Sequence, residues 1–293
     1  MTEQTEDPRD QATLLRRLEA LLGEESVSAD YVRLWIGLLQ AQTDTLTALV
    51  DSQPQPARSS GARQGPILKP GTVRFDPVLI RRLFDAIRTV SESYGGTVGE
   101  LARLCSAMDR DPALLETLVR SAAFASGEQS LEQLGRRLDV SAALLLFWGR
   151  LLAAPFVTHA AGQLEPSAAR VGSHGTCPVC GSPPGLASLQ AETGKRLLHC
   201  SLCGHSWPFD RLACPFCNSR QGAVITRITV KDEGARWIET CRSCKHYLKT
   251  VDLRQLPESQ EFYPLAEEVA SLHLDLLAEQ EGCLAKPPYA AMR

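Results

Sequence analysis

Hydrophobic side chains recur at helical spacing through the first 165 residues of the chain. Three amphipathic stripes come first, and in each the apolar positions return every three or four residues, as they do on one face of a helix. These stripes are Leu14, Leu15 and Leu18; Tyr31, Leu34, Trp35 and Leu38; and Ile80, Leu83, Phe84, Ile87 and Val90. Further helices are predicted around 98–107, 112–125, 130–138 and 141–154. We therefore predict an all-helical domain over residues 1–168.

The second and third stripes are separated by the segment DSQPQPARSSGARQGP, residues 51–66. Its Pro, Ser and Gly content predicts a mobile linker loop. The leucine and aromatic stripes around it are compatible with a groove for a partner protein. Amphipathic stripes usually face the protein's own core, so core packing is the simpler interpretation.

From Gly172 onward the pattern changes to short runs of the kind found in strands. The run AVITRITV, the turn KDEG and the following ARWIET indicate a β-hairpin, and Gly194 provides the turn of an earlier one. Candidate strands are 186–190, 195–199, 205–212, 223–230, 235–240 and 246–253. After Pro257 a helical pattern returns over 264–282, where Gly282 is a plausible stop.

The composition is that of a soluble globular protein, with 22% charged and 44% hydrophobic residues over 293 positions. The acidic start MTEQTEDPRDQ lacks the charged and apolar regions of a signal peptide. The most apolar run, 141–157, is interrupted by Arg150 and ended by Pro155, so it predicts a buried helix and no membrane span. We expect a cytoplasmic protein, whose thiols stay reduced.

Eight of the ten cysteines form four C-x-x-C pairs. In a reducing compartment such pairs indicate metal ligands, because each pair places two thiolates on one tight turn and two turns complete a tetrahedral site. The predicted ligands are Cys177, Cys180, Cys200, Cys203, Cys214, Cys217, Cys241 and Cys244. Zinc and a single rubredoxin-type iron both suit four thiolates, so we expect two metal ions, iron or zinc.

The pairs can combine in sequence, in a nested arrangement or as a cross-brace. The intervals between successive pairs are 19, 10 and 23 residues, whereas about 15–20 is usual within one ribbon. An internal repeat favours the sequential arrangement: the pattern C-P-x-C-x-S followed by C-x-x-C-x-H occurs twice. A duplicated unit is expected to hold its own complete site. We therefore predict one ribbon around residues 177–203 and a second around residues 214–244. The cross-brace remains the main alternative.

The full prediction is an α+β fold: the helical domain 1–168, two tandem rubredoxin-like or zinc-ribbon modules at 172–212 and 213–255, and a C-terminal helix and tail at 258–293. Gly181, Gly204 and Asn218 follow their pairs and tolerate the positive φ that such turns often need. Lys245 does not fit, so we expect the fourth turn to be the least regular.

The remaining candidates for chemistry carry less information. His205 and His246 follow the second pair of each repeat; four sulfurs already fill a site, so we expect surface strand residues and not spare ligands. Cys105 lies in an apolar helical pattern and is expected in the core. The sequence holds no phosphate-binding loop, dinucleotide fingerprint or H-E-x-x-H motif. We therefore predict no catalytic residues and no enzyme.

Five blocks in order carry a family resemblance: CPVCGSPP, LLHCSLCGHSW, RLACPFCN, CRSCKHYLKTVDL and LAEEVASLHLDLLAEQEG. Over roughly residues 140–283 the chain resembles the FdhE family, the formate dehydrogenase accessory proteins. The resemblance implies a cytoplasmic protein that binds the catalytic subunit of respiratory formate dehydrogenase before its export and is needed for an active enzyme. It also implies rubredoxin-like iron binding at the eight paired cysteines. Self-association into a homodimer is left open.

Two other functions compete with this interpretation. The first is a tandem zinc-ribbon protein that binds nucleic acid, although the net charge of −3 and the negative charge of two metal–thiolate sites oppose it. It draws on aromatic and basic residues of the ribbon region: Trp207, Phe209, Phe216, Trp237, Arg211, Arg220 and Arg236. The second is a rubredoxin-like electron carrier, which requires iron and a reversible colour change.

Overall fold

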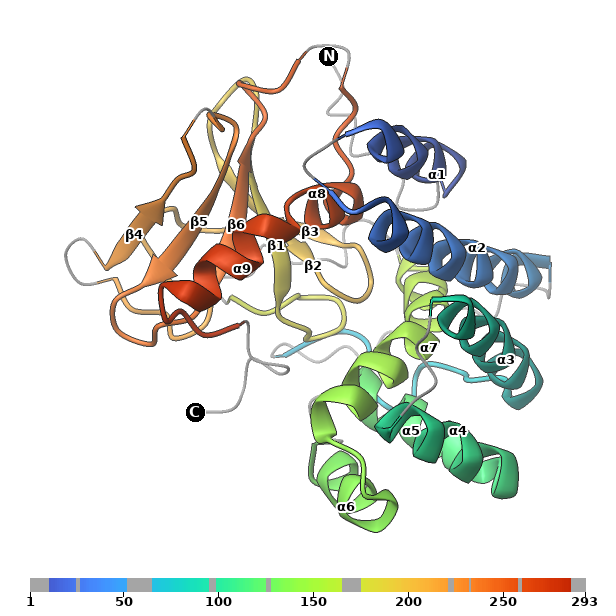
Figure 1. Ribbon diagram of the computed structural model, residues 1–293. Helices are drawn as coiled ribbons and strands as arrows, with labels where there is room; N and C mark the ends of the chain where they lie inside the picture. The colour runs from blue at the N-terminus through green and yellow to red at the C-terminus, as the bar shows by residue number, and fades with distance from the viewer. Residues whose placement is uncertain are drawn as a thin grey trace.

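The N-terminal half of the protein is helical, as the hydrophobic pattern predicts. The computed structural model describes residues 11–24, 27–51, 65–94, 99–124, 128–164, 175–220, 224–231, 233–257 and 260–285, so most of the predicted linker 51–66 lies outside the described residues. The helices are α1 (Gln11–Ala20), η1 (Leu21–Gly23), α2 (Ala29–Asp51), α3 (Pro77–Ser93), α4 (Glu100–Arg110), α5 (Ala113–Ala123), α6 (Glu128–Leu138) and α7 (Ala142–Gly162). In Figure 1 they gather beside a sheet built from the second half of the chain.

Helix α7 corrects the sequence prediction, because it continues through Pro155 to Gly162. A proline inside a helix has no N–H to donate to the carbonyl four residues earlier, which here belongs to Leu151. The side chain of Gln42 on α2 replaces that donor: its Nε2 donates to the Leu151 carbonyl at 2.8 Å. The helix therefore continues past Pro155 although one of its backbone hydrogen bonds is missing.

Helix α7 is also the central helix of this half. By length and composition it is the single helix in the described part of the chain that could cross a membrane, and half of its most apolar window is buried inside the protein. It packs closely on α5, because a Cβ at Gly149 would lie 2.4 Å from the Cβ of Ala122. Trp148, Leu152 and Phe156 are buried in the surrounding core, as the sequence predicts for this run.

The six strands of the described residues form one sheet, to which each of the two tandem ribbons predicted from the sequence contributes three neighbouring strands. The strands are β1 (Pro184–Leu189), β2 (Arg196–Cys200), β3 (Ser206–Pro208), β4 (Ile225–Ile228), β5 (Arg236–Cys241) and β6 (Tyr247–Asp252). Their order is β3-β2-β1-β6-β5-β4. Within each half the neighbouring strands are antiparallel. The two halves meet where β1 runs parallel to β6, with Leu186 opposite Lys249 and Leu189 opposite Asp252.

The C-terminal helix is broken where the sequence predicted one helix over 264–282. It consists of α8 (Pro264–Ala270) and α9 (Leu272–Gln280), which separate at Ser271. The buried side chain of Lys249 explains the break, because its Nζ lies 2.9 Å from the carbonyl oxygen of Glu268 and 2.7 Å from the carboxylate of Asp275. The ammonium group therefore donates to the Glu268 carbonyl, which in a continuous helix would accept a backbone hydrogen bond from the residue four positions later.

These C-terminal helices join the two halves of the molecule. Figure 1 shows α9 lying across the sheet and α8 beside α1. Tyr263, Ala266 and Val269 share a buried cluster with Leu18 and Leu39. The largest buried cluster likewise runs without interruption from the helices into the first cysteine ribbon. The helical half and the sheet are therefore packed as one body around the first four cysteines.

Candidate metal centres

Eight cysteine sulfurs gather in two groups of four. Within each group, the sulfur atoms all lie within 4.8 Å of one another. The groups are Cys177, Cys180, Cys200 and Cys203, and Cys214, Cys217, Cys241 and Cys244. This is the sequential arrangement that the internal repeat favours, and neither group has the membership that a cross-brace requires.

The spacing of the sulfurs suits a metal ion and not a disulfide. All eight paired cysteines are free of disulfides. The sulfur–sulfur contacts within the groups range from 3.4 Å between Cys180 and Cys200 in the first to 3.7 Å between Cys217 and Cys241 in the second. Sulfurs placed tetrahedrally at a zinc–sulfur distance of about 2.3 Å would stand about 3.8 Å apart. Each group could therefore hold one tetrahedral ion after small side-chain adjustments.

The internal repeat also appears in the backbone hydrogen bonds of the four turns. The amide of the first cysteine in each pair donates to the carbonyl five residues later. The partners are Cys177 and Ser182 at 2.8 Å, Cys200 and His205 at 2.9 Å, Cys214 and Ser219 at 3.0 Å, and Cys241 and His246 at 3.0 Å. The Ser and His at these positions of the repeat thus share a backbone role in closing the turns.

The residue after each pair has positive φ in all four turns. Gly181, Gly204 and Asn218 have φ of 80°, 71° and 55°, as expected, and Lys245 has φ of 65°. The expectation that the fourth turn would differ is therefore not met in its backbone. Lys245 is strained in this conformation, because its Cβ lies close to the backbone when φ is positive. Its carbonyl accepts a hydrogen bond from the Leu284 amide at 2.8 Å.

The first group is closed on two sides by the helical half. The amides of Ile67 and Leu68 donate to the carbonyls of the first turn, Pro178 at 3.2 Å and Val179 at 2.8 Å. On α7, Arg150 Nη2 donates to the hydroxyl of Ser201 in the second turn at 2.8 Å. The sequence offered one weak signal for this cover, the apolar pair Ile67–Leu68 directly after the polar linker.

The second group is more open. Cys214, Cys241 and Cys244 are buried, whereas Cys217 is exposed. Its own small cluster adds Val224 and the partly buried Phe216 and Ile225. The two groups therefore have the same ligands and the same turns but different access to solvent.

Burial opposes charge on these sulfurs when no cation is present. It raises the pKa of the Cys177 thiol well above its ordinary value and raises the pKa of Cys244 to about 11. The pKa of Cys214 is raised for the same reason. A bound cation would have to displace these protons, so metal uptake by either group would release protons and strengthen with rising pH.

The histidines of this region lie beside the thiol groups and not within them. His205 stacks on Trp207 with 6.4 Å between ring centres, and the His246 ring lies 5.6 Å from that of Phe216. His199 is buried, and burial lowers its pKa to about 4, so the ring is neutral at pH 7. Its two nitrogens each lie 2.8 Å from a serine hydroxyl, on Ser188 and Ser206. This contact ties β1, β2 and β3 together beside the second turn.

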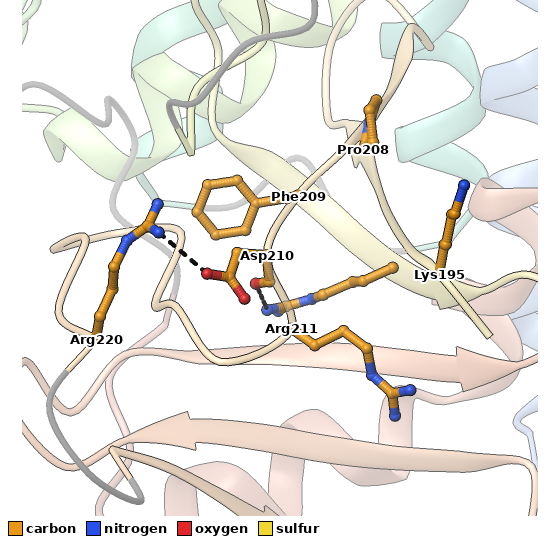
Figure 2. A pocket seen from close by; sticks show the side chains of 7 residues that line it. Lys195, Pro208, Phe209, Asp210, Arg211 and Arg220 are labelled. Carbon is orange, nitrogen blue, oxygen red and sulfur yellow. Dashed lines mark hydrogen bonds and ion pairs between the residues drawn. The ribbon is translucent and has the colours of Figure 1, made fainter. Parts of the chain in front are cut away.

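A cavity of about 350 Å³ lies next to the segment that joins the two ribbons (Figure 2). Basic residues predominate in its wall: Lys195, Arg196, Arg211 and Arg220, against the single acid Asp210. Figure 2 shows Arg220 directed toward Asp210, an ion pair at 3.1 Å, and Arg211 directed away from it. The charge of one of these basic residues is paired elsewhere, because Arg196 Nη2 lies 2.8 Å from the carboxylate of Glu239.

The aromatic residues of the ribbons are mostly covered. Trp207, Phe209 and Trp237 are 1%, 8% and 3% exposed. The guanidinium of Arg227 lies over the Trp237 ring, 3.6 Å from its centre. Nucleic-acid bases need an open ring face for stacking, and these three rings do not offer one.

The two cysteines outside the groups differ from each other in setting. Cys105 is 6% exposed in the helical core, as expected. Cys283 is partly exposed and its sulfur lies 3.4 Å from the hydroxyl of Thr240. It therefore provides a cysteine close to the sheet that belongs to neither thiol group.

Comparison with known protein families finds matches over the cysteine-rich part of the chain. Residues 176–211 match the model described as FdhE, central domain, and residues 212–290 match FdhE, C-terminal domain. The boundary between the two falls beside the predicted division between the ribbons. Each matched region contains one complete group of four cysteines.

Curated proteins extend the similarity beyond the cysteines. A protein named FdhE homolog from Stutzerimonas stutzeri (strain A1501) is 30% identical over 292 residues, which covers 96% of this chain and 89% of that protein. An FdhE homolog from Haemophilus influenzae (strain PittGG) is 34% identical over 157 residues, 53% of this chain and 48% of its own length.

A solved structure shares the fold. The crystal structure of the FdhE protein from Pseudomonas aeruginosa superposes with a TM-score of 0.60, covers 99% of this chain and 96% of its own, and is 24% identical. At that identity the similarity supports the architecture alone: a helical N-terminal half followed by a sheet.

Proposed function

Because the chain belongs to the FdhE family of formate dehydrogenase accessory proteins, we propose that it binds the catalytic subunit of a respiratory formate dehydrogenase and holds it during maturation. In this proposal the protein acts in the cytoplasm, before export of its partner, and is not itself an enzyme. The observation that carries the proposal is the alignment with an FdhE homolog over 96% of the chain, which includes the helical half as well as the ribbons.

We also propose that the eight paired cysteines are the ligands of two metal ions, either iron or zinc. The clustering of their sulfurs supports this assignment. A tetrahedral ion bound by four thiolates supplies folding energy to a small ribbon, and iron would in addition supply a redox potential. The chain's own residues shape the turns, close the first site and join both ribbons to the helices.

The packing suits a protein that presents a fixed surface to a partner. The sheet is continuous across both ribbons, and α8 and α9 connect it to the first helices. A rigid surface loses little conformational entropy on binding, which favours affinity. The helical half and the ribbons are therefore expected to contact the partner as one unit.

Formate dehydrogenase activity in a strain that lacks this protein tests the proposal, with the catalytic subunit followed by immunoblot. We expect the polypeptide to persist while activity is lost, and activity to return with the wild-type gene. Cys177→Ser should fail to restore activity, whereas Cys283→Ser, which lies outside both groups, should restore it. Normal activity in the deletion strain would refute the proposed function.

Direct binding is tested separately by capturing the tagged protein and probing for the catalytic subunit. Capture is expected from cells whose formate dehydrogenase lacks its cofactors, and weaker capture from cells with the mature enzyme. Light scattering of the purified chain measures whether two copies associate. Equal capture of immature and mature subunit would contradict a role in maturation.

Nucleic-acid binding is the second candidate, and the basic cavity beside Lys195, Arg211 and Arg220 is the observation in its favour. The buried aromatic rings count against it. Phosphate contacts give a steep dependence on salt, so filter binding at two salt concentrations separates the two functions. The electron-carrier alternative is tested by reduction of the iron-loaded protein, which should change colour reversibly if it applies.

A further inference from the structure

The two thiol groups share ligands and turn geometry, yet their surroundings differ. We infer that they have different roles: the first holds its metal in slow exchange as part of the core, and the second exchanges its metal faster with incoming thiols or chelators through Cys217. The inference rests on the proposed occupancy of both groups by metal. It adds to the proposed function by naming the site at which a partner could act on a bound ion.

The first observation is the exposure of the sulfur-bearing residues. In the first group, Cys177, Cys180, Cys200 and Cys203 are 1%, 3%, 8% and 2% exposed. In the second group three cysteines are equally buried, but Cys217 is exposed. An incoming ligand must reach the ion or one of its sulfurs, and only the second group offers such a route without prior opening.

The second observation is the origin of the contacts that hold each group. Both turns of the first group are bound by the helical half, through Ile67, Leu68 and Arg150. Leu68 is 1% exposed and belongs to the same buried cluster as the first four cysteines. Opening of this group on the side of the helical half would separate the segment 65–69 or helix α7 from it, which costs part of the main core.

The second group is held by shorter-range contacts among the described residues. The amide of Arg242 donates to the carbonyl of Val224 at 2.8 Å, and the Ser243 hydroxyl donates to that of Ser219 at 3.3 Å. These partners lie within the second ribbon, and outside it the amide of Leu284 donates to the Lys245 carbonyl at 2.8 Å. In the turn around Cys217, only the partly buried Phe216 reaches the main core cluster and Cys217 itself is exposed, so local opening there is expected to have a lower free energy.

Exchange at Cys217 is a ligand substitution without electron transfer. An incoming thiol loses its proton and forms one metal–sulfur bond, while the bond to Cys217 breaks and its thiolate accepts a proton from solvent. The ion keeps its charge and its number of ligands throughout. The substitution needs an approach to the ion beside an exposed sulfur, which the second group provides.

The test uses the full chain loaded with two equivalents of zinc and mixed with excess 4-(2-pyridylazo)resorcinol, whose zinc complex is coloured. We expect two phases of one zinc equivalent each, with rates at least about tenfold apart, which corresponds to about 1.4 kcal/mol in the free energy of opening. Iodoacetamide added in parallel should label Cys217 first among the eight paired cysteines, whereas labelling of Cys283, which lies in neither group, does not bear on the inference. Equal release rates, or earlier labelling of Cys177 or Cys180, would overturn the inference.

Variants then assign the phases. Leu68→Ala removes part of the cover over the first group and should accelerate the slow phase alone. Leu276→Ala serves as the control, since that leucine is 54% exposed on α9, and it should leave both phases unchanged. If Leu68→Ala folds as wild type but its slow phase is unchanged, the helical half does not protect the first group and the inference fails.

This experiment and the test of the proposed function have separate readouts. Zinc release needs no formate dehydrogenase, so loss of the maturation role would leave the two phases in place. Conversely, a single phase in a protein that still restores formate dehydrogenase activity would refute only the division of roles between the two groups.

Discussion

The hydrogen bond between Gln42 and the Leu151 carbonyl predicts a specific coupling with Pro155. Gln42→Ala removes the one side chain that donates to this carbonyl, at 2.8 Å, in the place that Pro155 leaves without an N–H. Leu151 is 7% exposed, so water has little access to its carbonyl and would not replace the lost donor. An unsatisfied buried acceptor costs about 1–3 kcal/mol, and we expect Gln42→Ala to destabilise the protein by that amount.

A double-mutant cycle isolates the cause of that loss. Pro155→Ala restores a backbone N–H within reach of the Leu151 carbonyl, so Gln42→Ala should cost at least about 1 kcal/mol less in that background. Urea unfolding followed by circular dichroism at 222 nm measures each free energy from the midpoint and slope. Gln40→Ala, at an exposed position on the same helix, is the control and should change stability by less than about 0.5 kcal/mol.

The result that would refute this reasoning is an equal cost of Gln42→Ala with proline and with alanine at position 155. The amide of Gln42 would then stabilise the protein through some contact other than its replacement of the missing helical donor. A loss below about 0.5 kcal/mol in the wild-type background would refute it as well.

Three further predictions concern backbone strain, helix packing and pH. Lys245→Gly should stabilise the metal-loaded protein by about 0.5–1 kcal/mol in urea unfolding, because φ of 65° strains a residue with a Cβ and suits glycine. Gly149→Ala should destabilise the protein by about 1–3 kcal/mol in the same assay, because its Cβ would lie 2.4 Å from a carbon of α5, whereas Gly71→Ala places a Cβ in open space. Asp252 accepts hydrogen bonds from Arg254, which lowers the pKa of the carboxylate. This contribution to stability is complete above the unfolded pKa of about 3.9 and is lost as the pH falls through the folded value, so the stability difference between wild type and Asp252→Asn should shrink on acidification below about pH 4 in pH-dependent thermal unfolding.

The helices and the grouping of the cysteines follow from short-range information. Each amphipathic stripe lies within one helix, and each C-x-x-C pair fixes its own turn, so local spacing is enough to predict both. The repeated pattern of Ser and His after the pairs marks two copies of one unit, and the same backbone hydrogen bond closes the turn at each of these positions. Such hydrogen bonds span only five residues.

The features that the sequence did not predict depend on contacts between distant segments. The predicted end of α7 at Pro155 was wrong because Gln42, 109 residues away from Leu151, supplies the missing donor. The break at Ser271 likewise depends on Lys249, which lies on a strand that the helix covers. A helical pattern shows which face is apolar, but it does not show which distant polar group will satisfy a backbone atom.

The parallel pairing of β1 with β6 has a consequence for how copies of this protein meet. It joins the first strand of one repeat to the last strand of the other, a head-to-tail junction that leaves β3 and β4 as unlike outer strands. Head-to-tail contacts between copies form a ring where the rotation closes and a filament where it does not. The β3 edge opposes such growth, since it has only three residues and ends in Pro208, which cannot donate to a new neighbour. With three residues against the six of its counterpart β6, this strand offers few backbone groups to a neighbouring copy.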